Sequence, residues 1–227
     1  VPCAEWPREG RVRAPVFRAD GREVPEEGPP PIPEEVVRGR RRLKLSNLGK
    51  VFWPEEGVTK GELLAYYRDV APALVPHLRE RPFTMKRYPD GWQGKSFFQK
   101  QAPSHMPEWI PTAPFPASSR EGERRIVDYA VVNDELALLW VVNMGCLDMH
   151  AWASRRDKPD RPDWVMFDLD PSEGATFEQV IEVADLVRQT LEVLELESVP
   201  KTSGSRGIHV LVPITRRHGY PEAREFA

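Results

Sequence analysis

Apolar residues recur along this chain at the spacing that is typical of helices. One long segment is residues 176–197, in which a single face would carry Phe177, Val180, Ile181, Ala184, Val187, Leu191 and Leu194. The same spacing predicts a helix over residues 60–71 and a second, short helix over residues 73–79. Thr59 and Glu62 have the spacing of a capping box, which predicts that the first of these helices begins directly after Thr59.

Short runs of β-branched and aromatic residues, bounded by turn-forming residues, are typical of strands. They predict strands over residues 83–88, 96–100, 126–132, 146–153, 164–171 and 208–214. The first two of these are expected to form a hairpin. Residues 134–143 are apolar at helical spacing, whereas the proline-rich residues 102–120 predict a loop. Strands and helices in this order predict an α+β fold.

Proline is concentrated near the N-terminus, where residues 29–33 read Pro-Pro-Pro-Ile-Pro. Because proline-rich segments favour extended linkers, we expect a linker over residues 25–42 and a compact domain over residues 43–227. The chain has 227 residues, 40% of them hydrophobic, which is enough for one sizeable core. It starts without Met and ends directly after residues expected to form a loop, so we expect a piece of a longer protein.

Two classes of protein are unsupported by the sequence. No run of about 18 apolar residues is present, and the N-terminus lacks the basic and apolar regions of a signal peptide. We therefore expect a cytoplasmic protein without a membrane partner. Cys3 and Cys146 are too far apart for a CxxC metal clip, so both are expected to be free thiols.

The formal charge of −3 does not by itself indicate a nucleic-acid partner, because phosphate-binding surfaces are usually basic. The charges are nevertheless segregated. Acidic residues dominate residues 176–197, whereas residues 38–50 contain Arg and Lys and no acid. An acidic outer helix could therefore mask a basic cleft.

Two aspartates, Asp168 and Asp170, end the apolar run that precedes Pro171. Side chains alternate across a strand, so both carboxylates should lie on one face, with Cα atoms about 7 Å apart. Converging carboxylates repel each other unless a cation intervenes, and their hard oxygens select Mg²⁺ or Mn²⁺. In phosphoryl transfer such a pair can hold two ions. Acids that only cap a turn give the same pattern.

The segment from Lys201 to Gly207 combines hydroxyl groups and glycines with the cations Lys201 and Arg206. Such a loop could cradle a phosphate, but its composition is equally typical of a glycine-rich hairpin turn. His209 should share a strand face with Leu211. Because a single histidine in a strand is usually structural, the residues alone leave both interpretations open.

Three motifs taken together resemble the polymerase domain of bacterial LigD, a multifunctional DNA repair ligase of non-homologous end joining. They read Leu-Asp-Met-His at 147–150, Trp-Val-Met-Phe-Asp-Leu-Asp-Pro at 164–171 and Lys-Thr-Ser-Gly-Ser-Arg-Gly-Ile-His-Val at 201–210. The resemblance covers about residues 43–227. It implies a fold of the archaeo-eukaryotic primase superfamily, with an RRM-like core in which helices flank a mixed or antiparallel sheet.

The resemblance also implies a catalytic site. Asp168 and Asp170 match the family's metal-binding acids, and Lys86 matches a further active-site lysine. The implied cofactors are two Mn²⁺ or Mg²⁺ ions, with NTP or dNTP as substrate. The family needs a third metal-binding aspartate downstream of His209. Asp148 is not matched to that role, so we expect the third acid beyond Ala227 and a domain that lacks its C-terminal part.

Four further residues match the family's nucleotide site. The resemblance places Ser203 near the sugar of the incoming nucleotide and His209 near its phosphates. Arg206 occupies a basic position of the same loop. His150 matches an active-site histidine, which implies a role in organising the nucleotide or metal site.

DNA contacts are implied for two pairs of residues. Lys50 and Lys60 match the lysines that hold the 5′-phosphate on the far side of a DNA gap, and a helix start at Lys60 would favour an anion. Phe97 and Phe98 match aromatic residues that stack on template bases. The plain alternatives are ordinary surface lysines and, because neighbouring strand residues alternate, at least one phenylalanine facing the core.

We therefore expect a template-dependent repair polymerase that fills gaps and extends ends at DNA breaks in the bacterial nucleoid. Its expected partners are broken or gapped double-stranded DNA bearing a 5′-phosphate, nucleotides and, from the family, Ku. Residues 1–24 resemble the end of LigD's ATP-dependent ligase domain, which implies a ligase domain in the parent chain. Two alternatives remain: a non-catalytic module that binds 5′-phosphorylated DNA ends, and a primase, which the ligase-like remnant disfavours.

Overall fold

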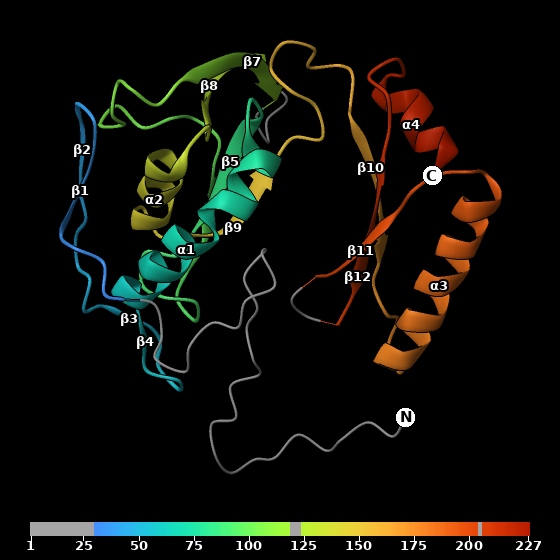
Figure 1. Cartoon of the computed structure of the whole chain (residues 1–227), viewed down its shortest axis with the longest axis horizontal. Helices are drawn as coiled ribbons and strands as arrows, with labels where there is room; N and C mark the ends of the chain where they lie inside the picture. Colours follow the sequence, from blue (N-terminus) through green and yellow to red (C-terminus); the bar gives the residue numbers. More distant parts are fainter. Residues whose placement is uncertain (1–29, 119–123, 204–205) are drawn as a thin grey trace. The chain divides into compact units, whose positions relative to one another are not determined.

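The computed structural model describes residues 30–118, 124–203 and 206–227 (Figure 1). The expected ligase remnant, residues 1–24, and Cys3 lie outside the described residues. The chain divides into two units that are interleaved in sequence. Unit 1 contains the described residues up to 77 together with 86–97 and 133–148, and unit 2 contains 78–85, 149–227 and the described part of 98–132.

Helices and antiparallel strands alternate, as an α+β fold requires. The helices are α1 (Lys60–Leu78), α2 (Glu135–Asn143), α3 (Phe177–Val193) and α4 (Tyr220–Phe226). The strands are β1 (Glu35–Arg38), β2 (Arg41–Lys44), β3 (Val51–Trp53), β4 (Val58–Thr59), β5 (Pro82–Arg87), β6 (Phe97–Gln99), β7 (Thr112–Ser118), β8 (Arg124–Val131), β9 (Cys146–Ala151), β10 (Trp164–Leu169), β11 (Val199–Thr202) and β12 (Ile208–Pro213). Among the described helices, none is both long and apolar enough to cross a membrane.

A hairpin of β1 and β2 occupies part of the segment expected to be a linker. Val36 and Leu43 face each other in its register and both are buried. Gly39 supplies the positive φ of 60° that the tight turn needs. The expectation of an extended linker is therefore wrong for residues 35–42, because two buried positions among many charges are too few to show as a periodic pattern.

Helix α2 anchors this hairpin. Its residues Leu136 to Val142 are buried on every side. Arg41 donates to the N-cap Asp134 at 2.6 Å, and Arg38 donates to Glu135 at 2.8 Å. Burial alone would raise the pKa of Asp134, but Arg41 and the backbone N–H groups of Ala137 and Leu136 hold it below its usual value. Arg38 and Arg41 of the basic segment are thus engaged in ion pairs with the start of α2.

Helix α1 is one continuous helix, so the prediction of a separate short helix over residues 73–79 is wrong. The capping box is confirmed, because Thr59 N–H donates to Glu62 Oε2 at 2.8 Å and Glu62 N–H donates to Thr59 Oγ1 at 3.2 Å. The helix continues through Pro72 and Pro76. Its buried stripe extends to Leu78, and this packing outweighs the lost backbone hydrogen bonds.

The larger sheet has the order β6-β5-β8-β7, and β9 also pairs with β5. Strand β7 lies at its edge, within residues 102–120, where the proline content predicted only a loop. Pro114 and Pro116 occupy alternate positions of β7, so their missing N–H groups lie on the same side of the strand. An edge strand tolerates proline when that side is unpaired, which explains why the loop prediction failed here.

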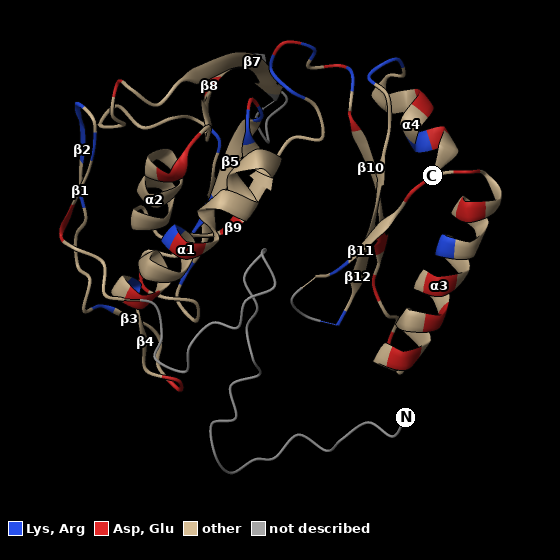
Figure 2. Cartoon of the chain, in the orientation of Figure 1, with Lys and Arg blue, Asp and Glu red and all other residues tan. Residues whose placement is uncertain are grey.

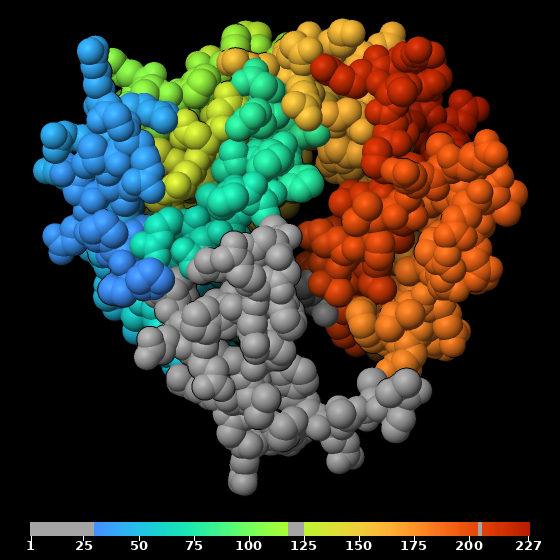
Figure 3. Space-filling view, in the orientation of Figure 1, coloured from blue at the N-terminus to red at the C-terminus, as the bar shows by residue number. Residues whose placement is uncertain are grey.

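The smaller sheet of unit 2 has the order β10-β12-β11, and α3 covers one of its faces (Figure 1). The core between them is formed by Val165, Val180, Ala184, Leu191, Ile208, Val210 and Val212. Acidic residues recur along α3 (Figure 2), and the helix lies at the surface in the space-filling view (Figure 3). Phe177 and Ile181, predicted on its apolar face, are 40% and 48% exposed.

Candidate active site

The antiparallel pair β10–β12 divides its side chains between two faces. Val165 and Val210 are buried against α3. Asp168 and His209 lie at alternate positions and therefore point to the opposite face, here named the open face. The register places Asp168 directly opposite His209, with Asp168 Oδ1 3.3 Å from His209 Nε2. The Asp168 side chain is 52% exposed, so it is accessible to a ligand.

Asp170 follows the end of β10 and lies against Gly207. A Cβ atom on Gly207 would meet Asp170 Oδ1 at 2.5 Å, the Leu169 carbonyl oxygen at 2.9 Å and Ser203 Oγ at 3.1 Å. Ser203 Oγ accepts a hydrogen bond from Gly207 N–H at 3.1 Å, and Ser203 N–H donates to the Gly207 carbonyl at 3.0 Å. The missing side chain at position 207 thus lets the acid and the serine hydroxyl approach the same backbone position.

The segment after β11 connects it to β12 and contains Ser203, a candidate binding residue. Strands β11 and β12 pair antiparallel, so residues 203–207 connect them, as the turn interpretation expects. The turn also brings Ser203 beside Asp170, as the binding interpretation requires. Arg206 lies in the same turn and is exposed.

Lys201 is a site candidate that the sequence pattern left in a loop. It lies in β11, where the register sets it opposite His209. Asp168, His209 and Lys201 therefore form a row across three adjacent strands on the open face. The Lys201 side chain is exposed, and its Nζ donates to the Thr202 carbonyl at 3.2 Å. The strand that carries Val199 and Lys201 has only four residues, which is too short for its side-chain pattern to predict it.

The donor atoms on the open face fit a divalent cation in their chemistry. Asp168 and Asp170 offer carboxylate oxygens, which hard ions such as Mg²⁺ and Mn²⁺ prefer. Within the described ranges, no group of three or more His, Cys, Asp or Glu side chains is placed to hold a metal ion. Asp168, Asp170 and His209, all described residues, therefore do not form such a group in this structure.

Lys86 lies in a separate cluster in unit 1. Its Nζ is 2.8 Å from Asp148 Oδ2, and the Tyr88 hydroxyl donates to the same oxygen at 2.8 Å. The hydrogen bond to Asp148 and a further one to Tyr88 raise the pKa of Lys86 above its usual value, so the ammonium stays charged. Asp148 is held by these donors, consistent with its not being matched to the third metal ligand.

The two lysines expected to contact DNA, Lys50 and Lys60, lie at the N-terminal end of α1. Lys50 Nζ donates to the Pro89 carbonyl at 2.6 Å and to Asp90 Oδ1 at 2.9 Å. Lys60 is only 5% exposed, so it is not an ordinary surface lysine, and its Nζ donates to the Ser46 carbonyl at 2.7 Å. Burial, and then the charges of Lys50 and Arg87, lower the pKa of Lys60 to about 8.

Both phenylalanines of β6 are exposed, Phe97 by 46% and Phe98 by 60%. The expectation that at least one of them faces the core is wrong, because β6 is short and neither face of it is covered. In unit 1 the Arg87 guanidinium lies 5.3 Å from the centre of the Phe97 ring. In unit 2 the Phe98 ring contacts His150 edge to face, with 5.3 Å between ring centres.

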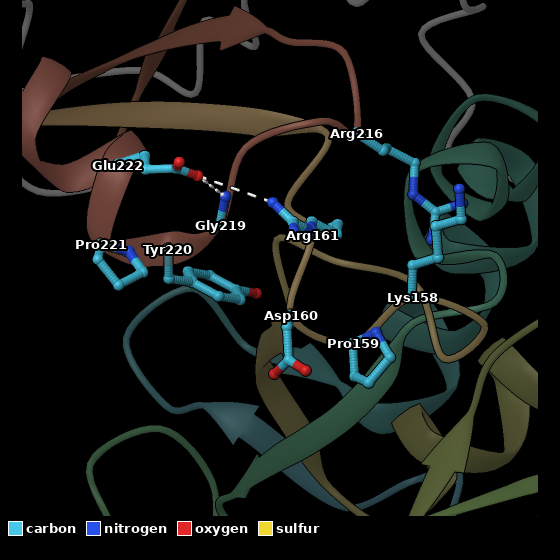
Figure 4. A pocket seen from close by; sticks show the side chains of 9 residues that line it. All are labelled: Lys158, Pro159, Asp160, Arg161, Arg216, Gly219, Tyr220, Pro221 and Glu222. Carbon is cyan, nitrogen blue, oxygen red and sulfur yellow. Dashed lines mark hydrogen bonds and ion pairs between the residues drawn. The ribbon is translucent and has the colours of Figure 1, made fainter.

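The predicted residues thus fall into local groups. In unit 2 the structure pairs Asp168 with His209 and sets Asp170 and Ser203 around Gly207, and Arg206 lies in the same β11–β12 connection. A polar cavity of about 740 Å³ elsewhere in unit 2 contains none of them (Figure 4). It is lined by Lys158, Pro159, Asp160, Arg161, Arg216, Gly219, Tyr220, Pro221 and Glu222. Asp157 holds the Arg216 guanidinium there by two hydrogen bonds.

A comparison with known families shows which family the chain belongs to. Residues 59–227 match the family described as LigD, primase-polymerase domain. The chain belongs to the LigD primase-polymerase family. This confirms the resemblance that the three motifs carried, and with it the α+β fold.

Known LigD proteins and a solved LigD structure are similar to this chain. It is 37% identical to the multifunctional non-homologous end joining protein LigD of Mycolicibacterium smegmatis, over 76% of this chain and 22% of that protein. It is 32% identical to LigD of Pseudomonas aeruginosa, over 100% of this chain and 28% of that protein. The polymerase domain of Mycobacterium tuberculosis Ligase D in complex with DNA is 32% identical, with a TM-score of 0.70 over 76% of this chain and 61% of that one. The chain therefore spans less than a third of its curated LigD relatives.

Proposed function

We propose that this chain provides the nucleotide and DNA-end sites of a bacterial end-joining polymerase, which fills gaps with ribonucleotides or deoxynucleotides. The observation that carries the proposal is the open face of a LigD-family domain, where Asp168 and Asp170 lie beside His209 and Ser203. Carboxylates, an imidazole and a hydroxyl on one exposed sheet face supply the groups that bind a triphosphate and its cation.

The reaction is an in-line attack of a primer 3′-hydroxyl on the α-phosphate, with pyrophosphate as leaving group. Bound divalent ions, Mn²⁺ or Mg²⁺ and two in number, would activate the hydroxyl and neutralise the triphosphate. Asp168 and Asp170 would hold them through carboxylate oxygens. Because phosphoryl transfer depends mainly on positioning and electrostatics, the rigid strand pair that fixes these side chains is the main contribution of the fold.

Residues around the acids would bind the nucleotide. His209 would donate from its imidazole to a phosphate oxygen, and Lys201 in the next strand would add a positive charge along the same row. Ser203, oriented by Gly207 N–H, would contact the sugar. Arg206 would meet the phosphates from the turn. Lys86 and His150 are proposed as further active-site residues, Lys86 as a fixed positive charge.

DNA would be held by the residues at the base of α1 and on β6. Lys50 and Lys60, which affect each other electrostatically, are proposed to bind a 5′-phosphate. The exposed rings of Phe97 and Phe98 would stack on template bases, at about 1 to 3 kcal/mol per base.

Affinity for a 5′-phosphate should fall as the pH rises. Free Lys60 loses its proton near a pKa of about 8, whereas a bound phosphate favours the ammonium form. Proton uptake therefore accompanies binding above that pH, and the affinity should drop about tenfold between pH 7 and 9. Equilibrium titrations with gapped DNA measure this. The Lys60→Arg variant stays charged and should lose most of the pH dependence; the same drop in that variant would contradict a role for Lys60.

Adding one methyl group at Gly207 should disable the nucleotide site. In Gly207→Ala the new Cβ would clash with Asp170 and the Leu169 carbonyl, so the carboxylate must move. We expect at least a tenfold loss of manganese-dependent nucleotide affinity, because ~1 Å displacements at such sites are costly. Gly219→Ala is the matched control, since its nearest neighbour would lie 3.5 Å away. Unchanged affinity in Gly207→Ala would show that Asp170 is not positioned through this contact.

The proposed function is tested by nucleotide addition across a short DNA gap with a downstream 5′-phosphate. The protein that carries this domain should add nucleotides to the primer in a template-dependent, manganese- or magnesium-dependent manner. Addition that ignores the template, or no addition by a protein that binds the gap tightly, would refute it.

A specific observation favours one alternative, a module that binds 5′-phosphorylated ends without synthesis. Within the described residues, no group of three or more His, Cys, Asp or Glu side chains is placed to hold a metal ion, and a module without synthesis needs none. Such a module would show 5′-phosphate-dependent binding but no manganese-dependent nucleotide binding. Primase activity would instead appear as synthesis without a primer.

The wider setting is also part of the proposal. We propose a polymerase domain that begins with the β1–β2 hairpin and runs to residue 227, preceded by a ligase-derived segment over 1–24. The alignment with the Pseudomonas LigD over 100% of this chain supports this continuity. Ku and a ligase domain of the same protein would be its partners, in the bacterial cytoplasm at the nucleoid.

A further inference from the structure

A pocket of about 350 Å³ in unit 1 is lined mainly by aromatic rings, five of its eight residues. Its lining residues are Trp53, Leu63, Tyr66, Tyr67, Tyr88, Trp92, Leu147 and Asp148. Tyr66 and Trp92 are about half exposed, at 50% and 49%, so the rings at the mouth are open to solvent. None of the residues assigned to the nucleotide or the 5′-phosphate lines this pocket.

The backbone around the pocket is held rigidly. Trp92 N–H donates to the Phe52 carbonyl at 3.0 Å, which fixes the turn beside β3. Gly91, with a φ of +86°, makes this possible, because a Cβ there would lie 2.9 Å from the Phe52 oxygen. On the other wall Tyr88 N–H donates to the Gly145 carbonyl at 2.7 Å. The backbone positions that carry Trp92 and Tyr88 are therefore fixed by hydrogen bonds.

The surroundings of the pocket are positively charged. Lys50 is bonded to Pro89 and Asp90, in the same turn that carries Trp92. Lys60 begins the helix whose next turns supply Leu63, Tyr66 and Tyr67. The one acid of the lining, Asp148, is paired with Lys86. An aromatic pocket beside cations suits a flat, uncharged ring that is attached to a phosphate.

We propose that this pocket binds an unpaired nucleobase by stacking, with the neighbouring phosphate held by Lys50 and Lys60. The inference rests on the proposed function, because it places the base next to the proposed 5′-phosphate site. The bound base would come either from an unpaired position of the DNA or from a free nucleotide. An organic cation would suit the rings. The only carboxylate among the described lining residues, Asp148, is already paired with Lys86, so they offer an organic cation no unpaired carboxylate.

The test uses the 227-residue chain and gapped, 5′-phosphorylated DNA with 2-aminopurine at each unpaired position in turn. One position should lose fluorescence on binding, because stacking on an indole quenches the base. Trp92→Ala should restore the fluorescence and weaken binding about tenfold, as expected for one stacked base. An abasic site at that position should weaken DNA binding by the wild type by the same factor. It should weaken DNA binding by Trp92→Ala by less than about twofold. Trp92→Phe should retain most of the affinity. Phe177→Ala is the matched control, because it removes an exposed ring elsewhere.

Further arms separate the possible outcomes. If adenosine monophosphate reverses a Trp92-dependent signal and the abasic DNA binds as well as the intact DNA, the source is a free nucleotide. If tetramethylammonium competes while base removal has no effect, the pocket binds a cation and the proposal is overturned. Additive losses from Trp92→Ala and base removal also overturn it. If preference for the 5′-phosphate persists in that case, the proposed function stands without the pocket.

Discussion

Replacing Asp168 or Asp170 with asparagine is expected to abolish nucleotide addition by the protein that carries this domain. Asparagine keeps the shape of the side chain but removes the charge that would hold a divalent ion. Loss of that interaction removes several kcal/mol from the transition state, so addition should slow at least about a hundredfold. The measurement is the single-nucleotide extension rate across a gap, with manganese-dependent nucleotide binding as a second readout.

A matched control exists on α3 of the same unit. Asp185 is an exposed acid that pairs with Arg188, and Asp185→Asn removes an equal charge away from the open face. That variant should extend primers like the wild type. If Asp168→Asn or Asp170→Asn retained about a tenth of the wild-type rate, the two acids could not be the metal ligands.

The second large effect concerns the DNA end. Lys50→Glu combined with Lys60→Met should abolish the preference for gapped DNA with a 5′-phosphate. Hydrogen bonds to charged groups are worth about 1.5 to 3 kcal/mol, so affinity for the phosphorylated DNA should fall about tenfold to a hundredfold. Affinity for the same DNA without the phosphate should fall far less.

Two controls keep this prediction specific. Lys44→Glu reverses an exposed charge on β2 and should weaken both DNAs equally and slightly. Circular dichroism and thermal unfolding check that the double variant folds, since Lys60 is buried and methionine fills a similar volume. Equal losses for both DNAs in the double variant would mean general phosphate attraction instead of a 5′-phosphate site.

Much of the fold could be predicted because its signals are local. The capping box of Thr59 and Glu62, the apolar run of α2 and the long stripe of α3 each follow from neighbouring residues. Strand β7 could not be predicted, because proline propensity depends on whether the strand lies at an edge, which is a tertiary property. Strand β11 and helix α4 are too short for their periodicity to be visible.

The candidate site shows the same division. The pairing of Asp168 with His209 follows once two strands are placed in antiparallel register, and the motifs already suggested both residues. The burial of Lys60 and the row formed with Lys201 depend on packing and register that no local pattern encodes. The aromatic pocket draws Trp53, Tyr66 and Trp92 from separate segments, so only the folded chain reveals it.

The central claim is that the open face binds a nucleotide through a divalent ion held by Asp168 and Asp170. The most direct measurement is the affinity of the 227-residue chain for a labelled ribonucleoside triphosphate on gapped DNA, with and without Mn²⁺. We predict that Mn²⁺ tightens binding at least about tenfold, and that the Asp168→Asn, Asp170→Asn double variant loses this gain. Nucleotide binding that is indifferent to Mn²⁺, or a gain that survives in the double variant, would contradict the account.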